Sequence, residues 1–228
     1  IMDQAFMEDY LGLRVESVDE VEILRRMEEG IYNKEEYEKA LAWTREHCKE
    51  GRDDNPDFVR FTREQKDEQW AFTIKMYCNP NLPEQFGEEM LGHNAIAAGF
   101  QGQRQWTDHW PNCDYPEAVL NSSFDFGGKK EPIAFATEND VLNGLGMLFC
   151  KLLTNRAQIF ADVRTFWSPE ATKRVTGYEF TGHAKENGGI IHLLNSGAAC
   201  LDACGECTDE NGNHVMKEWW NVTDEDIK

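Results

Sequence analysis

Basic residues are scarce in this sequence of 228 residues. It contains 23 Lys and Arg against 42 Asp and Glu, which gives a formal net charge of -19 at pH 7. Binding to nucleic-acid phosphates requires clustered Lys and Arg, so we expect no nucleic-acid partner. The acidic balance is compatible with divalent cations, although most of the surplus acids are expected on solvated faces.

Long hydrophobic runs and a leader segment are also missing. No stretch approaches the roughly 18 consecutive apolar residues of a membrane-spanning helix, so no membrane span is expected. The first residues, IMDQAFMEDYLG, lack the basic and apolar blocks of a signal peptide. The seven cysteines are an odd number, which suits a reducing cytoplasm better than a disulfide scaffold. The start at Ile1, inside an ordinary fold segment, indicates a piece of a longer chain.

The composition that remains is that of a globular protein. Hydrophobic residues make up 40% and charged residues 29% of the chain, enough for one large or two small domains. The pattern changes from helix-rich to rich in strands and turns near residue 155. We therefore predict an α/β domain at residues 1–155 and the start of a β-rich domain at residues 156–228.

A strand–helix–strand pattern follows residue 131. Residues 132–137 read as a buried strand, 140–153 as a helix and 157–163 as a second strand, which is the size of a βαβ unit. Residues 188–199 contain another apolar strand. The pattern predicts a Rossmann-like, open and mostly parallel sheet flanked by helices, although a boundary near residue 155 would separate the two strands of the unit.

Two acids lie at the ends of these predicted strands. Glu138 follows the first strand and Asp162 falls near the end of the second. Neighbouring parallel strands lie roughly 4.8 Å apart, and ligands of such sheets bind at the carboxyl ends of the strands. Two close carboxylates favour a shared proton or a divalent cation such as Mn²⁺ or Mg²⁺. The alternative is a helix N-cap and a strand-end acid without a common role.

Three cysteines near the C-terminus form a second candidate site. Cys200, Cys204 and Cys207 have a Cys-x₃-Cys-x₂-Cys spacing that can hold an iron–sulfur cluster. With His214 they could instead make a four-ligand zinc site. Ordinary cysteines in a turn are the third interpretation.

Several stretches together resemble the L-fucose isomerase family, whose members also act on D-arabinose. They are GHNAIAAGFQGQRQWTDHWPN, EAVLNSSFDF, ATENDVLNG, FADVRTFWSPEA and GIIHLLNSGAACLD. The resemblance extends less sharply to residues 10–32 and 40–43, so it covers nearly the whole chain. It implies a cytoplasmic, hexameric aldose–ketose isomerase that depends on Mn²⁺.

The resemblance also implies roles for individual residues. Glu138 of ATEND and Asp162 of FADVRT correspond to metal ligands and to the acid/base pair of the family. Gln101 of GFQGQ and Ser196 of LLNSG correspond to residues that contact the sugar substrate. The third metal ligand of the family, a His, lies beyond the end of this chain, and an N-terminal domain is absent as well. We therefore expect little metal binding and little activity from these 228 residues alone.

Two other classes of protein stay open from the residues themselves. One is a metal-cluster protein that uses Cys200, Cys204 and Cys207. The other is a non-catalytic α/β assembly module that keeps the fold.

Overall fold

The computed structural model describes most of the chain. The described residues are 3–79, 85, 87, 95–100, 113–195, 200–202, 210–212 and 217–223. The helices are α1 (Gln4–Leu11), α2 (Glu20–Glu29), α3 (Lys34–His47), α4 (Arg63–Tyr77), α6 (Asp114–Asn121), α7 (Val141–Thr154), α8 (Pro169–Thr176) and α9 (Gly182–Glu186). The strands are β1 (Ala97–Gly99), β2 (Phe124–Asp125), β3 (Gly128–Lys129), β4 (Ala134–Ala136), β5 (Asp162–Trp167) and β6 (Ile190–Leu194). Short 3₁₀ turns occupy Asp57–Val59, Thr137–Asn139 and Trp219–Asn221.

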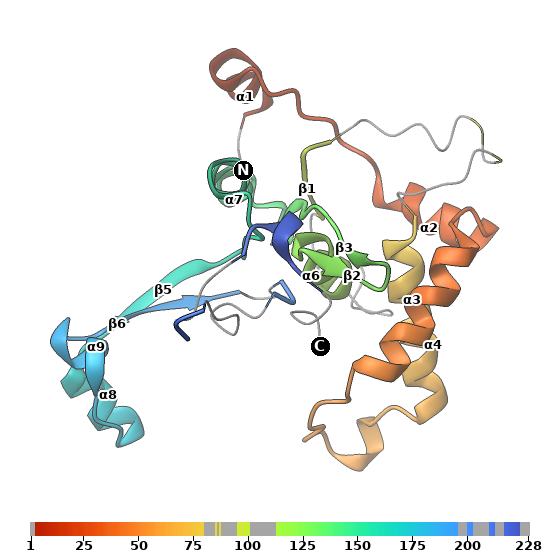
Figure 1. Ribbon diagram of the computed structural model, residues 1–228. Coiled ribbons are helices and arrows are strands. Elements are labelled where there is room, and N and C mark those ends of the chain that lie inside the picture. Colours follow the sequence, from red (N-terminus) through yellow and green to blue (C-terminus); the bar gives the residue numbers. More distant parts are fainter. Residues whose placement is uncertain are drawn as a thin grey trace.

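Helices α2, α3 and α4 lie side by side along one edge of the molecule (Figure 1). Polar caps define where they begin: the Asn33 side chain accepts a hydrogen bond from the Glu36 amide, and Thr62 forms a capping box with Gln65. Helices α3 and α4 pack on α6 through one apolar cluster, made of Ala40, Leu41, Ile74, Tyr77, Cys78 and Val119. Burial of this cluster fixes α3 and α4 against α6.

Strands β1 and β4 form a parallel pair at the centre of the fold, with Ala98 opposite Phe135. The chain between them passes through α6 and the β2–β3 hairpin. The fully buried Asn121, the last residue of α6, covers the other edge of β4. Its side-chain nitrogen donates to the Phe135 carbonyl oxygen at 2.9 Å, and its side-chain oxygen accepts from the Phe135 amide at 2.8 Å. The amide thus takes the place of a neighbouring strand, because buried backbone groups need partners.

Helix α7 packs directly on β4. Asp140 caps its first turn by accepting from the amides of Leu142 and Asn143. Gly144 allows the close approach, since a Cβ at this position would lie 3.0 Å from the Cβ of Ala136. The contact buries a second apolar cluster, made of Ala134, Ala136, Met147, Leu148 and Phe160.

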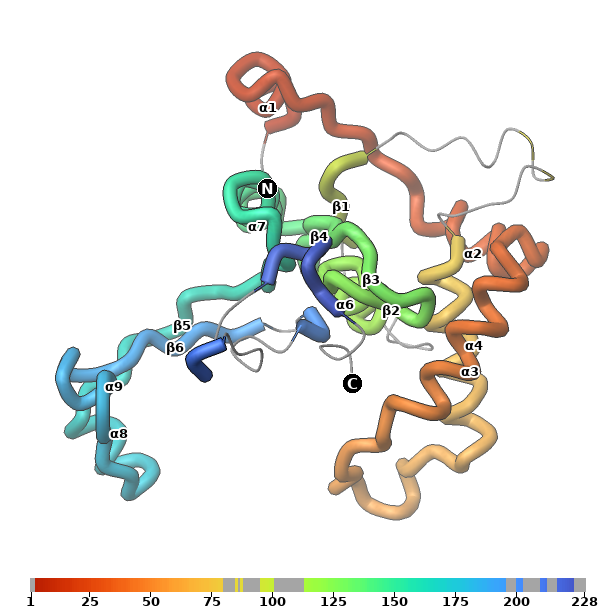
Figure 2. The backbone as a smooth tube through the Cα atoms, viewed as in Figure 1, coloured from red at the N-terminus to blue at the C-terminus, as the bar shows by residue number. Residues whose placement is uncertain are grey.

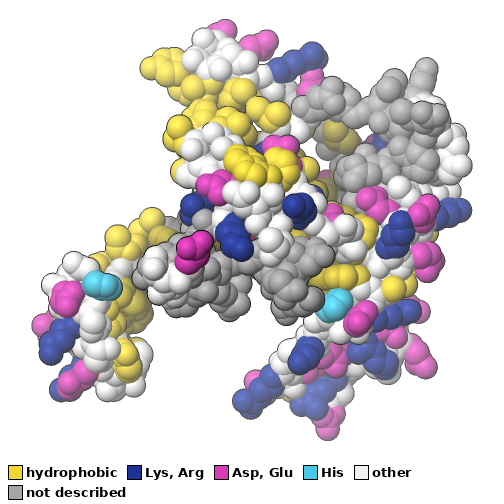
Figure 3. Space-filling model, in the orientation of Figure 1, with side chains coloured by type: hydrophobic (Ala, Val, Ile, Leu, Met, Phe, Trp, Pro, Cys, Tyr) yellow, Lys and Arg dark blue, Asp and Glu magenta, His cyan; other side chains and the backbone are white. Residues whose placement is uncertain are grey.

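Strands β5 and β6 form a separate antiparallel pair that extends away from the core, with α8 and α9 at its far end (Figure 1 and Figure 2). Asp162 pairs with Leu194, and Trp167 with Ile190. The apolar side chains of this arm are exposed, Val163 at 74% and Ile191 at 65%. Figure 3 shows hydrophobic side chains gathered along the arm and over α1 and α7.

The structure confirms the α/β class and corrects one part of the prediction. Strand β4 and helix α7 lie where the sequence predicted them. Residues 157–161 are not a strand, and Asp162 begins β5 rather than ending a strand. The partner of β5 is β6, not β4, so the parallel unit is formed by β1, α6 and β4. The division at residue 155 stays a prediction.

Among the described residues, no helix is long and apolar enough to cross a membrane.

Replacing Asn121 with Ala tests the role of its amide at the edge of β4. The change leaves the amide and carbonyl of Phe135 buried without these partners, at about 1–3 kcal/mol for each group. We expect the free energy of unfolding of the complete protein to fall by about 3 kcal/mol in urea titrations. The control is Asn221→Ala, which removes a hydrogen bond to Glu218 on the exposed surface. Equal stability of the two variants would contradict the assignment.

Candidate active site

The turn that follows β4 has an unusual backbone conformation. Thr137 is buried, whereas Glu138 and Asn139 have φ values of 55° and 52°. Positive φ in a residue other than glycine costs about 1–3 kcal/mol, and such residues gather at functional sites. Asn tolerates this region, but a Glu there has no local reason to adopt it. The turn holds the Glu138 side chain exposed at the carboxyl end of a buried strand.

The end of β1 lies against this turn. A Cβ on Gly99 would lie 2.6 Å from the Ala136 carbonyl oxygen and 3.0 Å from the Cα of Asn139. Only a glycine leaves room for that approach. Gln101, the predicted substrate contact two positions further along the chain, lies outside the described residues, and so does Ser196.

Asp162 reaches the same end of α7 by a different route from the one predicted. The side-chain amide of Asn143, in the first turn of α7, donates to the Ala161 carbonyl oxygen at 3.2 Å. This bond anchors the backbone immediately before Asp162, while Glu138 lies just ahead of the same helix. The prediction that neighbouring parallel strands bring the two acids together is therefore wrong. The N-terminal turn of α7 brings their backbone segments to a common end instead.

The two carboxylates differ in their surroundings. Asp162 forms an ion pair with Arg164, with 3.1 Å between Oδ2 and Nη2, and both side chains are partly exposed. No described residue forms a hydrogen bond or ion pair with the Glu138 carboxylate. Within the described part of the chain, no group of three His, Cys, Asp or Glu could hold a metal ion. Carboxylate oxygens are the ligand type that a hard cation such as Mn²⁺ prefers, so these two side chains could contribute to such a site only together with further ligands.

A third acid, missed by sequence reasoning, lies beneath the turn. The side chain of Glu117 in α6 is fully buried. Its Oε2 accepts a hydrogen bond from the Thr137 hydroxyl at 2.8 Å, and its Oε1 accepts from the Cys113 thiol at 3.3 Å. Burial raises the pKa of Glu117 to about 7, against the lowering effect of these two hydrogen bonds.

A sequence signal for Glu117 did exist. Cys113, Glu117 and Asn121 are spaced four residues apart and therefore share one face of α6. All three are buried. An acid placed between residues of a buried helical face needs hydrogen-bond donors, and that requirement points to a site.

The cysteine motif is only partly within the described residues. Cys200 is half-buried, whereas Cys204, Cys207 and His214 lie outside them. The segment after Cys200 docks on the end of α6, where Asp202 accepts hydrogen bonds from the amide and hydroxyl of Ser123. This docking gives residues 200–202 a structural role. The metal-cluster hypothesis stays untested.

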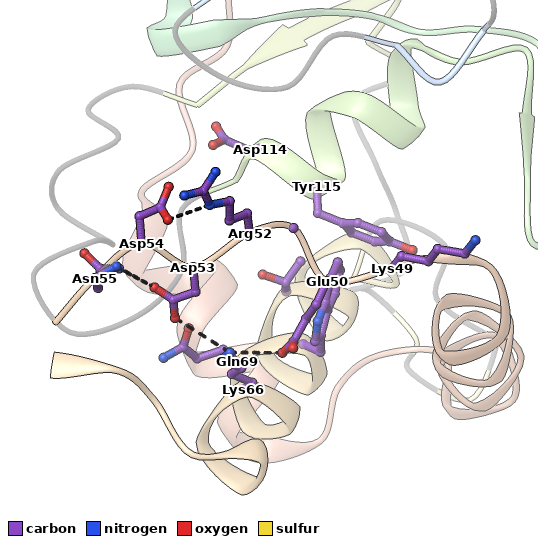
Figure 4. A pocket seen from close by; sticks show the side chains of 13 residues that line it. Lys49, Glu50, Arg52, Asp53, Asp54, Asn55, Lys66, Gln69, Asp114 and Tyr115 are labelled. Carbon is purple, nitrogen blue, oxygen red and sulfur yellow. Dashed lines mark hydrogen bonds and ion pairs between the residues drawn. The ribbon is translucent and has the colours of Figure 1, made fainter. Parts of the chain in front are cut away.

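A hollow of about 640 Å³ lies between residues 49–55, helix α4 and the start of α6 (Figure 4). Its acids face basic partners: Asp54 pairs with Arg52 at 2.7 Å, and Glu50 pairs with Lys66 at 3.1 Å. Glu138 and Asp162 do not line it. The hollow is therefore separate from the candidate carboxylates.

Comparison with known proteins places the chain in a family. Residues 1–155 match the family described as L-fucose isomerase, second N-terminal domain. The L-fucose isomerase of Bacteroides thetaiotaomicron is 60% identical over 240 residues, that of Bacteroides fragilis 57% over 239, and that of Streptococcus pneumoniae 52% over 237. Each alignment takes in 100% of this chain and 40% of the relative.

These relatives are sugar isomerases by name. The chain belongs to the L-fucose isomerase family. It spans about 40% of the length of the curated relatives that it matches.

Replacing Glu138 with Gly or with Ala tests the strain in the turn. Both variants lack the carboxylate, but only glycine adopts positive φ without steric cost. We expect the Glu138→Gly variant of the complete protein to be more stable than Glu138→Ala by about 1 kcal/mol in urea titrations. Equal stability of the two variants, or a more stable Ala variant, would show that the left-handed turn is not strained.

Proposed function

We propose that the complete protein is a Mn²⁺-dependent isomerase that converts L-fucose to L-fuculose, and D-arabinose to D-ribulose. The observation that carries this proposal is the family match over residues 1–155, together with 60% identity to a named L-fucose isomerase along the whole chain. The exposed carboxylate of Glu138, held on a strained turn at a strand end, supports the same conclusion.

Glu138 and Asp162 are the residues proposed to hold Mn²⁺. Both supply carboxylate oxygens, the ligand type that Mn²⁺ and Mg²⁺ prefer. A bound divalent cation would polarise the substrate carbonyl and stabilise the negative charge that develops on the two substrate oxygens. Arg164, which pairs with Asp162, would balance part of the negative charge of the two carboxylates when no metal ion is bound.

The same two carboxylates are proposed to move the proton. Converting an aldose to a ketose through an ene-diol moves one proton from C2 to C1 and the hydroxyl proton from O2 to O1. One carboxylate takes the proton from C2 while the other lies on the opposite side of the substrate, and their tasks exchange in the reverse direction. Gln101 and Ser196 are proposed to contact the sugar hydroxyls and orient the chain of the substrate.

The active site is completed by parts outside this chain. We propose that a His from the remaining sequence is the third metal ligand, and that the 228 residues alone have little activity. We further propose a cytoplasmic, hexameric enzyme. The exposed apolar side chains of the β5–β6 arm, such as Val163 and Ile191, support burial of this arm in the complete assembly.

Charge removal at either carboxylate tests the assignment of the site. In the complete enzyme, we expect Glu138→Gln and Asp162→Asn each to reduce the rate of ketose formation from L-fucose by on the order of 10³-fold, because each change removes a ligand and a proton acceptor. The control is Glu131→Gln, an exposed acid paired with Lys151, which should leave the rate nearly unchanged. Unchanged turnover in both site variants would favour an assembly module instead.

Metal removal tests the cofactor separately. Dialysis of the complete enzyme against a chelator should abolish ketose formation, and added Mn²⁺ should restore it, because the carboxylates alone cannot stabilise a negatively charged ene-diol. Restoration by Zn²⁺ or iron but not by Mn²⁺ would favour a site built on Cys200, Cys204 and Cys207. Full activity after chelation would contradict a metal-dependent reaction.

A further inference from the structure

We infer that Glu117 is a positioning residue for the candidate metal site: its buried carboxyl holds the Thr137 hydroxyl and thereby fixes the left-handed turn that presents Glu138. The inference rests on the proposed role of Glu138 as a metal ligand. It concerns a residue of α6 that lies 21 positions before Glu138 in the sequence and is fully buried. Neither carboxyl oxygen of Glu117 is exposed to solvent, so Glu117 acts through its neighbours.

Burying the carboxyl group of Glu117 costs free energy, which indicates that this group has a specific role. A carboxyl group in an apolar interior loses its hydration, and an apolar side chain of similar volume would fill the same space without that loss. Glu117 lies in a helix whose neighbouring residues Ala118 and Val119 are buried and apolar. Its two oxygens are both used, one by the Thr137 hydroxyl and one by the Cys113 thiol. The hydrogen bonds therefore direct the carboxyl toward the end of β4.

Thr137 directly follows the buried strand β4 and is the first residue of the strained turn. Its side chain is 1% exposed, and the next two residues have positive φ. On the far side of the turn, Asn139 packs against Gly99 and Asp140 caps α7. The turn is thus held at its start by Glu117 and at its end by β1 and α7. A strained backbone conformation persists only when contacts on several sides hold it in place, as they do here.

Loss of the Thr137 anchor should release the strain and let Glu138 move away from the ligand geometry. Residues that orient a metal ligand without touching the metal typically change metal affinity by about 10- to 100-fold when they are replaced. A purely structural role would lower thermal stability and leave the affinity unchanged. Metal affinity is therefore the quantity that separates positioning from folding.

The test is a titration of the complete, metal-free enzyme with Mn²⁺, with free Mn²⁺ followed by its electron paramagnetic resonance signal. We expect Thr137→Val to weaken Mn²⁺ binding at least tenfold, because valine keeps the shape but lacks the hydroxyl. Thr137→Ser keeps the hydroxyl and should bind within about threefold of the unmodified enzyme. Glu117→Gln keeps the size but replaces one acceptor oxygen, and should weaken binding in the same direction as Thr137→Val.

A matched control exists elsewhere in the chain. Thr44 is buried like Thr137, and its hydroxyl forms a hydrogen bond with the Tyr115 hydroxyl at 3.0 Å. Thr44→Val should lower the melting temperature without changing Mn²⁺ affinity. Unchanged affinity in Thr137→Val would overturn the inference, and so would an equal loss of affinity in Thr44→Val.

A parallel titration of the Glu138→Gln variant separates failure of the positioning role of Glu117 from failure of the proposed metal site. If Glu138→Gln loses Mn²⁺ binding while Thr137→Val retains it, the metal site stands and the positioning role of Glu117 fails. If Glu138→Gln binds Mn²⁺ as tightly as the unmodified enzyme, the proposed metal site itself fails, and the role of Glu117 fails with it.

Discussion

The two hydrogen bonds between the Asn121 side chain and the Phe135 backbone hold β4 at the centre of the molecule. They join the end of α6 to the middle of the strand, while β1 pairs with the opposite edge. Helix α7 then packs on the same strand through Gly144. Because β4 is only three residues long, its place depends on these lateral contacts rather than on an extended sheet. The candidate site is built directly on the end of this strand.

Polar groups of α6 determine both the place of β4 and the shape of the turn after it. Asn121 supplies the edge of the strand, and Glu117, one helical turn earlier, supplies the anchor for Thr137. The cost of burying these groups is offset when their polar atoms have partners, and each side-chain nitrogen and oxygen of Asn121 and Glu117 forms a hydrogen bond. Local strain at Glu138 and Asn139 is thereby maintained by the rigid elements around it.

The sequence was sufficient to predict β4, α7 and the α/β class, because an apolar run, the Asp140 cap and helical periodicity follow one another there. It was misleading at residues 157–161, which precede β5 and are not part of a strand. That run is apolar because Phe160 packs against α7, not because the segment pairs as a strand. The antiparallel partner of β5 lies beyond two intervening helices, and such long-range pairing leaves no local pattern. Glu117 was missed because a single acid in a helix normally lies on a solvated face.

We propose that Glu138 and Asp162 act on one metal ion, although they lie on elements that do not pair with each other. A crystal structure of the complete enzyme grown with Mn²⁺ tests this most directly, because the anomalous signal of manganese locates the ion without prior assumptions. We expect one Mn²⁺ in bonding contact with carboxylate oxygens of both residues. A Mn²⁺ ion bound elsewhere, with Glu138 and Asp162 both facing solvent, would contradict it.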